Sequence, residues 1–299
     1  MSLPPAPFGR VLSAMVTPFA ADGSLDLDGA QAVASYLADH GHDGLVVSGT
    51  TGESPTTSVA EDGELLRAVV EAVGDRISVV AGVGTNSTAH SLELTEQAAK
   101  LGAAAVMVVT PYYSKPSQAG VLAHFEAVAG ASDLPVMLYD VPGRTGLRIG
   151  WETYQRAAEI ETVVAVKEAV GDLAQGVRLI RELGLTVYSG DDIANLAWLA
   201  HGAAGVISVV GHVSGDQNLG LVNAAEAGDF ERAQEIFHGL LPAIHGIMGV
   251  GNYGATTAKA ALQLAGVLDN RRVRLPLLEL DDTELSALRT SLESAGLLS

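Results

Sequence analysis

The feature that most constrains the fold is a series of eight apolar, strand-like runs. The runs cover residues 11–19, 44–52, 77–84, 104–113, 135–142, 163–169, 186–192 and 205–211. Stretches with helical apolar spacing lie between them, so each run starts 19 to 33 residues after the one before. This spacing is typical of βα units, and eight such units close into a (β/α)8 TIM barrel of the α/β class.

An open, doubly wound sheet is the alternative arrangement of such units. Its dinucleotide-binding fingerprint would follow the first strand. This chain reads TPFAADGS there, at residues 17–24, and lacks the fingerprint. A helix over 59–74 is well marked, because Ser58 and Glu61 form a capping-box signature before it and Gly74 suits its end. The missing fingerprint favours the barrel over the open sheet.

The pattern becomes entirely helical from about residue 226 onward. Three helices are expected there, within residues 229–248, 254–266 and 281–296, and they add no ninth strand. We therefore predict that residues 1–225 form the barrel with the active site. Residues 226–299 are predicted to form a small C-terminal helical appendage of the kind that often supports assembly.

Charge and cysteine content limit the classes of partner. The chain has 17 basic and 35 acidic residues and a net charge of −18, which argues against binding to nucleic acid or to an anionic membrane. An anionic substrate would therefore need local positive charge in its site. Cysteine is absent, no apolar run approaches the roughly 20 residues of a membrane span, and MSLPPAPFGR lacks a signal-peptide segment, so we predict a cytoplasmic protein.

One lysine lies inside an apolar run. The stretch VVAVKEAVG, residues 163–171, places Lys167 at or near the end of a strand that is buried on both faces. Burial disfavours the charged ammonium and lowers the pKa, and a neutral amine is a nucleophile. The alternative is that Lys167 reaches the surface or pairs with a carboxylate such as Glu168.

In a (β/α)8 barrel the active site forms at the carboxyl ends of the strands. Polar residues end three further runs, at 49–53, 110–113 and 139–144. Each has a structural alternative: the threonines could form a turn, the tyrosines could pack, and Arg144 could pair with Asp140 or Glu168. Convergence of all these strand ends at one mouth favours the functional interpretation.

The motifs at these strand ends resemble the dihydrodipicolinate synthase family of pyruvate-dependent class I aldolases. The strings are GTTGESPT (49–56), VTPYYSKPS (109–117), YDVPGRTG (139–146), VKEAVGD (166–172), YSGDD (188–192) and GVISV (205–209). Singly they are moderately specific, whereas their order and spacing together are highly specific. The resemblance runs from about residue 10 through the barrel and is weaker in the C-terminal helices.

This resemblance implies a Schiff-base reaction between pyruvate and L-aspartate 4-semialdehyde, giving 4-hydroxy-tetrahydrodipicolinate for lysine and diaminopimelate biosynthesis. Lys167 would attack the pyruvate ketone. Tyr139 would relay protons through the hydroxyl of Thr50 to Tyr113, which family members take from a neighbouring subunit. The resemblance further implies a homotetramer built as a dimer of dimers.

The remaining implied roles concern binding. Thr51, with nearby backbone amides, would hold the pyruvate carboxylate, and Arg144 would bind the carboxylate of the semialdehyde through a bidentate contact. Gly190 and Ile207 would shape the pocket through backbone groups. We expect no metal and no other cofactor.

The chain also departs from well-known family members. Asp140 stands where many have asparagine, and Gly143 stands where many have serine. Many bacterial relatives bind the inhibitor lysine through two histidines and a glutamate, and those places hold Val59, Asp62 and His90 here. Feedback inhibition by lysine is therefore expected to be weak or absent.

Three other functions remain open from the sequence. The chain could be another pyruvate-dependent aldolase, acting on N-acetylneuraminate or a 2-keto-3-deoxy sugar acid, although such enzymes usually lack an arginine at position 144. It could be a non-catalytic keto-acid sensor, although Lys167 and Tyr139 are both present. A metalloenzyme is disfavoured, because the eight histidines include no H-E-x-x-H motif, and His40 and His42 precede the second strand, at the bottom of the barrel.

Overall fold

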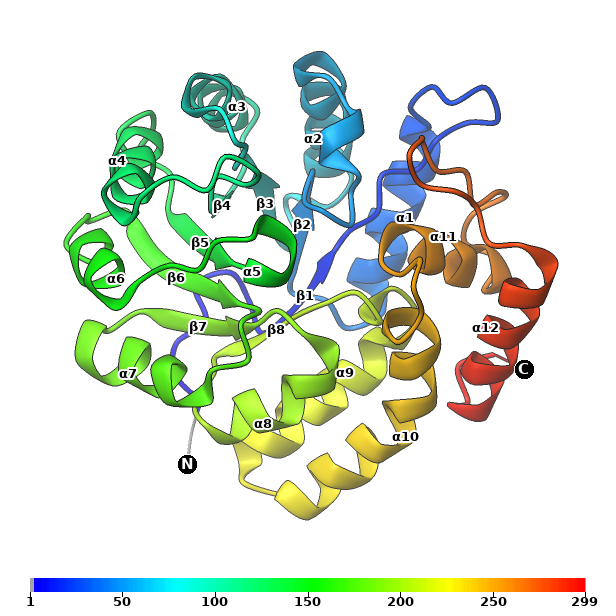
Figure 1. Cartoon of the computed structure of the whole chain (residues 1–299). Helices are drawn as coiled ribbons and strands as arrows, with labels where there is room; N and C mark the ends of the chain where they lie inside the picture. The colour runs from blue at the N-terminus through cyan, green and yellow to red at the C-terminus, as the bar shows by residue number, and fades with distance from the viewer. Residues whose placement is uncertain (1–2, 299) are drawn as a thin grey trace.

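The computed structural model describes residues 3–298, and its centre is a closed barrel of eight parallel strands (Figure 1). Neighbouring strands follow chain order, and β8 pairs with β1 to close the barrel. The strands are β1 (Val11–Ala14), β2 (Gly44–Val47), β3 (Ser78–Gly82), β4 (Ala105–Val109), β5 (Val136–Asp140), β6 (Val163–Glu168), β7 (Thr186–Ser189) and β8 (Gly205–Ser208). The predicted (β/α)8 barrel is confirmed, and the open sheet is wrong.

Helices surround the barrel on the outside (Figure 1). They are α1 (Leu27–Asp39), α2 (Val59–Val73), α3 (Thr88–Lys100), α4 (Gln118–Ala129), α6 (Trp151–Ala157), α7 (Leu173–Leu183), α8 (Asn195–Ala200) and α9 (Gly211–Ala227). Three short helical turns lie in the loops after strands: η1 (Ser54–Thr56), α5 (Pro142–Thr145) and η2 (Asp192–Ala194). The capping box predicted for α2 is present, with Ser58 and Glu61 bonded reciprocally and Gly74 as the C-cap.

Two apolar layers explain why the strands read as continuous runs. Met137 and Tyr139 of β5 face the barrel interior, whereas Leu138 between them packs in the layer under the helices. Phe8 fills the barrel interior near its amino-terminal end, where its backbone N–H donates to the hydroxyl of Tyr188 at 3.3 Å. Strands buried on both faces need apolar residues at every position.

The strands are shorter than the apolar runs that predicted them. The run 44–52 is a strand only as far as Val47, and the run 104–113 only as far as Val109. The chain then turns, and Ser48, Glu53 and Tyr113 have positive φ angles of 52°, 57° and 71°. The last residues of each run therefore form the loops at the mouth of the barrel.

The predicted C-terminal helices are present as α10 (Phe230–Met248), α11 (Ala255–Leu264) and α12 (Asp282–Ser294). Asp229 and Asp281 cap α10 and α12. α10 and α11 pack against α9, and α12 packs against α10 and α11 (Figure 1). Leu240, Ile247 and Ala258 belong to the same apolar core as the barrel helices. The division of the chain at residue 226 stays a prediction. Within residues 3–298, no helix is both long and apolar enough to span a membrane.

Candidate active site

Lys167 and Tyr139 are side by side inside the mouth of the barrel. They are register partners on β6 and β5, and because alternate residues of a strand face the same side, both side chains point into the barrel. The Nζ atom of Lys167 lies 4.5 Å from the centre of the Tyr139 ring. Lys167 is only 4% exposed to solvent. The predicted position of Lys167 at the end of a buried strand is thus correct.

The pKa of the Lys167 amine is lower than that of an ordinary lysine. The pKa of Lys167 is lowered to about 8, chiefly by burial; the carboxylate of Asp192 opposes the shift, and the charge of Arg144 adds to it. A lysine with a pKa near 8 has about one tenth of its amine neutral at pH 7, roughly 200- to 300-fold more than an ordinary lysine. Lys167 is therefore a competent nucleophile at neutral pH.

The pKa of Tyr139 shifts in the opposite direction from that of Lys167. Burial raises the pKa of Tyr139 to about 12, while the charge of Arg144 and hydrogen bonding by Thr50 lower it. The phenol therefore keeps its proton at neutral pH. A protonated phenol beside an amine with a lowered pKa forms a pair that can donate and receive protons within the site.

The alternative pairing of Lys167 with Glu168 is wrong. Successive strand residues point to opposite faces, and the Glu168 carboxylate accepts hydrogen bonds from the backbone N–H groups of Val170 and Gly171, both at 3.1 Å. Asp140 likewise faces away from the mouth and accepts a hydrogen bond from the Tyr154 hydroxyl at 3.0 Å. Neither carboxylate forms an ion pair with Lys167 or Arg144 among the described residues.

A cavity of about 460 Å³ opens beside Lys167. Six of the residues predicted from the sequence line it, namely Thr50, Thr51, Tyr139, Arg144, Lys167 and Gly190. A neighbouring chamber of about 200 Å³ shares three of these residues and is also lined by Tyr112. These strand ends thus form one site, as predicted from the barrel geometry.

Gly190 makes room for the lysine. A Cβ atom at this position would lie 2.8 Å from the carbonyl oxygen of Glu168, which is closer than real Cβ contacts allow, and 3.0 Å from Cγ of Lys167, which is a tight contact. The backbone N–H of Gly190 donates to that same carbonyl at 2.7 Å. Glycine is therefore required here for packing against the lysine.

Arg144 supplies the expected positive charge at the mouth. It is exposed at the end of α5, and its guanidinium lies 4.7 Å from the centre of the Tyr253 ring. Tyr253 belongs to the loop between α10 and α11, so the C-terminal region forms one wall of the cavity. The sequence patterns gave no signal for this contribution.

Two predicted residues lie outside the cavity of this chain. Tyr113 is 89% exposed and does not line either chamber, whereas its neighbour Tyr112 does. Ile207 is buried within the barrel, and Val209 lines the cavity near it.

Asp192 is a buried carboxylate that the sequence patterns did not single out. It accepts hydrogen bonds from the hydroxyl of Ser208 and from the backbone N–H groups of Val209 and Val210, at 2.9 and 3.1 Å. Its charge is the one that raises the pKa of Lys167. The signal was present, because Asp192 is the second aspartate of the quoted string YSGDD.

The histidines before β2 have structural contacts. His42 is buried between the Ser13 hydroxyl at 2.8 Å and the carbonyl of Leu37 at 2.9 Å, and His40 contacts Asp216 at 2.8 Å. Within residues 3–298, no group of three or more His, Asp or Glu side chains is placed to hold a metal ion.

The region compared with lysine-binding relatives is already hydrogen-bonded internally. Asp62 is buried and accepts hydrogen bonds from the hydroxyls of Ser48 and Thr57, at 2.9 and 2.8 Å. Val59 is half-buried at the start of α2, and His90 lies in the first turn of α3. The carboxylate of Asp62 is thus engaged by this chain's own hydroxyls.

Comparisons with known proteins agree with this geometry. The Dihydrodipicolinate synthetase family matches residues 7–295. A 4-hydroxy-tetrahydrodipicolinate synthase of Kineococcus radiotolerans is 55% identical over 294 residues, covering 98% of this chain and 95% of the relative.

Two solved structures are similar throughout. A dihydrodipicolinate synthase from Bacillus anthracis has a TM-score of 0.92 and 42% identity, covering 96% of this chain and 98% of that one. A dihydrodipicolinate synthase from Cyanidioschyzon merolae with lysine bound has a TM-score of 0.93 and 40% identity, covering 98% and 99%. With its whole barrel and its C-terminal helices matched in both sequence and structure, this chain belongs to the dihydrodipicolinate synthetase family.

Proposed function

We propose that this enzyme condenses pyruvate with L-aspartate 4-semialdehyde to give 4-hydroxy-tetrahydrodipicolinate, a step of lysine and diaminopimelate biosynthesis. The observation that carries the proposal is Lys167, a buried amine with a lowered pKa that opens onto a cavity beside Tyr139. Its relatives with this name, 55% identical at best among those compared, support the same reaction. The chain is thus a lyase that works through a Schiff base.

The first half of the reaction uses Lys167 and Tyr139. The neutral amine adds to the ketone carbon of pyruvate, Tyr139 donates the proton with which the ketone oxygen leaves as water, and a protonated imine remains. The imine nitrogen withdraws electrons, so a proton can leave the methyl group and an enamine forms. Thr51 and nearby backbone amides hold the pyruvate carboxylate during these steps.

The second half uses Arg144. Its guanidinium binds the carboxylate of the semialdehyde, which places the aldehyde carbon near the enamine for carbon–carbon bond formation. The amino group of the semialdehyde then attacks the imine carbon, releases the Lys167 amine and closes the ring. Arg144 thereby supplies the positive charge that a chain of net charge −18 otherwise lacks at long range.

Arg144 also provides the test against a sugar-acid aldolase. Arg144→Ala should leave borohydride trapping of pyruvate intact and lower kcat/KM for the semialdehyde by about 30-fold or more, corresponding to roughly 2–5 kcal/mol. Arg144→Lys should recover little, because an ammonium lacks the planar two-donor fork. Intact condensation in Arg144→Ala, together with turnover of N-acetylneuraminate or a 2-keto-3-deoxy sugar acid, would favour the other aldolase.

A homotetramer in the cytoplasm is part of this proposal, and it accounts for Tyr113. The side chain is 89% exposed in the single chain, so it is free to reach the site of a neighbouring copy and complete the relay through Thr50. Co-expressed Lys167→Ala and Tyr113→Phe subunits would then contain some sites with both functional residues. Activity well above that of either variant is expected, whereas no recovery would confine Tyr113 to its own chain.

Weak lysine inhibition completes the proposal. Asp62 is hydrogen-bonded within this chain, and Val59 offers no polar group, so a lysine ligand would find few partners there. Activity titrated with L-lysine should change little up to millimolar concentrations. Inhibition at micromolar lysine would contradict this.

A further inference from the structure

The loop that carries Thr50 and Thr51 has an unusual backbone. Glu53, three residues after Thr50, has a left-handed conformation with φ of 57°, and its N–H donates to the carbonyl of Thr50 at 3.1 Å. A residue with a side chain adopts this conformation only when surrounding contacts stabilise it. One such contact is the Thr17 hydroxyl, which donates to the carbonyl of Gly52 at 2.6 Å.

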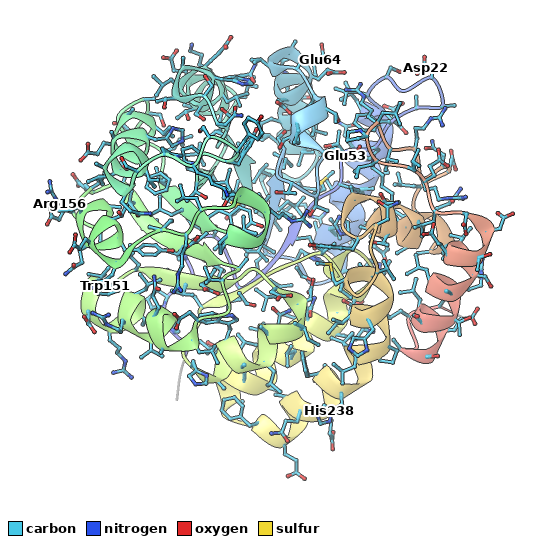
Figure 2. The ribbon with its side chains drawn as sticks, viewed as in Figure 1. Asp22, Glu53, Glu64, Trp151, Arg156 and His238 are labelled. Atoms are coloured by element: carbon cyan, nitrogen blue, oxygen red, sulfur yellow. The ribbon has the colours of Figure 1, made fainter. Side chains whose placement is uncertain are left out.

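The side chain of Glu53 supplies the stronger contact. It has no exposed surface, and it lies inside the molecule in Figure 2, whereas Glu64 and His238 project at the periphery. Its Oε1 atom lies 2.5 Å from Nζ of Lys259, and its Oε2 atom accepts from the backbone N–H of Arg274 at 2.9 Å. Both partners belong to the C-terminal region.

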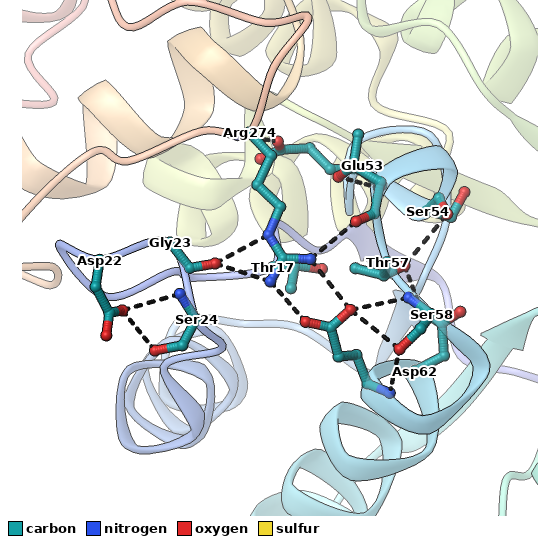
Figure 3. A network of polar contacts seen from close by, with 12 residues as sticks. Thr17, Asp22, Gly23, Ser24, Glu53, Ser54, Thr57, Ser58, Asp62 and Arg274 are labelled. Atoms are coloured by element: carbon teal, nitrogen blue, oxygen red, sulfur yellow. Dashed lines mark hydrogen bonds and ion pairs between the residues drawn. The ribbon is translucent and has the colours of Figure 1, made fainter.

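Lys259 is buried and forms a second hydrogen bond in addition to its contact with Glu53. It is 1% exposed on α11, and its Nζ also donates to the carbonyl of Arg272 at 2.7 Å. The side chain of Arg274 continues the network by donating to the carbonyl of Gly23, as Figure 3 shows, and it also donates to the Glu61 carboxylate. Buried charges need partners of opposite sign, so the loop and the C-terminal region stabilise each other.

We propose that Glu53 and Lys259 are positioning residues, whose buried ion pair lets the C-terminal helical region hold Thr50 and Thr51 in the geometry that binds pyruvate. The inference rests on the proposed function, because it needs pyruvate to be bound beside Thr51. Thr51 is buried and lines the cavity two residues from Glu53. Arg144 lies on a different strand-end loop, so its substrate should be affected less.

Glu53→Gln is the main test. The amide can accept from Lys259 through its oxygen, but its NH₂ group then faces the N–H of Arg274, donor against donor, and the loop must shift. We expect the KM for pyruvate and the pyruvate concentration for half-maximal borohydride trapping to rise about 10-fold or more, since misplacement of about 1 Å costs up to 10²-fold. The KM for the semialdehyde should stay within about twofold.

Glu61→Gln is the matched control. It neutralises a carboxylate that contacts the side chain of Arg274 and can still form the capping box of α2, but it leaves the Glu53–Lys259 pair intact. Its pyruvate dependence should equal that of the wild type. An equal rise in both variants would overturn the proposal.

The double variant Glu53→Gln/Lys259→Met separates positioning from stability. Neutralising both members removes the uncompensated charge that Lys259→Met alone leaves, so thermal stability should recover toward the wild type. Pyruvate binding should nevertheless stay impaired. Recovery of pyruvate binding together with stability would mean that the pair is only structural. Absence of a Lys167 adduct in the wild type would instead disprove the proposed function.

Discussion

The molecule contains two regions that are each built around a buried lysine. Lys167, in the mouth of the barrel, and Lys259, in the C-terminal region, both have a pKa lowered to about 8 by burial, and both ammonium positions face an aromatic ring. Lys259 is held by the carboxylate of Glu53 and a backbone carbonyl. Among the described residues, Lys167 has no hydrogen-bonded or ion-pair partner, and it lines a cavity instead.

The difference shows what distinguishes the proposed nucleophile from a structural lysine. Burial shifts both pKa values by a similar amount, so the shift alone does not identify the reactive residue. An open space beside the amine and a proton donor at Tyr139 are the features that only Lys167 has. Each of the following predictions tests this contrast.

The largest effect is expected from Lys167→Ala. The variant removes the only amine among residues 3–298 that lines the cavity, so pyruvate followed by borohydride should give no adduct and condensation should cease. In the wild type, one adduct should map by mass spectrometry to the peptide with Lys167. An adduct on Lys259 or Lys115 would mean that Lys167 is not the reactive lysine.

Removing the proton donor should have the next largest effect. Tyr139→Phe keeps the ring beside Lys167 and removes the hydroxyl, so kcat should fall by a factor on the order of 10²–10⁴. Circular dichroism and the melting temperature should stay close to the wild type. If turnover were nearly normal, Tyr139 would be a packing residue.

Lys259→Met should affect stability far more than Lys167→Ala does. It leaves the Glu53 carboxylate buried without its cation, which costs about 3–5 kcal/mol, whereas Lys167→Ala removes a buried cation that lacks such a partner. Urea unfolding of both variants measures the difference. Equal destabilisation by both substitutions would mean that Lys259 contributes no more to stability than Lys167 does.

The smallest effect is a pH dependence. Because the pKa of Lys167 is about 8, the neutral amine fraction should rise about tenfold per pH unit below pH 7 and level off above pH 8. The rate of imine formation at low pyruvate, measured by rapid borohydride quench, should follow this curve. A rate that climbs tenfold per unit through pH 9 would indicate an ordinary lysine.

Local signals were sufficient for the fold and for part of the site. The β-branched run before Lys167 predicts a buried strand, and Ser58 with Glu61 predicts the start of α2, because both patterns depend on residues close in sequence. The Glu53–Lys259 pair joins positions 206 residues apart, and Lys259 reads as one more polar residue in a helix. Its burial follows from how α11 packs, which no local pattern contains.

Roles that depend on surroundings were harder to predict. Asp192 resembles a turn residue in the sequence, and only the packing of β7 against β8 buries it beside two backbone N–H groups. Tyr253 contacts Arg144 through the loop before α11, far along the chain. In the proposed tetramer the surroundings of Tyr113 come from a neighbouring copy, which no pattern within one chain contains.

The packing of Phe8 under the barrel has a consequence for the order of events. Its ring lies 6.2 Å from that of Tyr188, and together they fill the end of the barrel opposite the mouth. This filled end leaves the mouth as the route by which, in the proposed reaction, both substrates enter and the products leave. Because Lys167 lies inside the mouth, the proposed reaction requires the ketone to bind before the aldehyde, and its covalent attachment is the first step of the cycle.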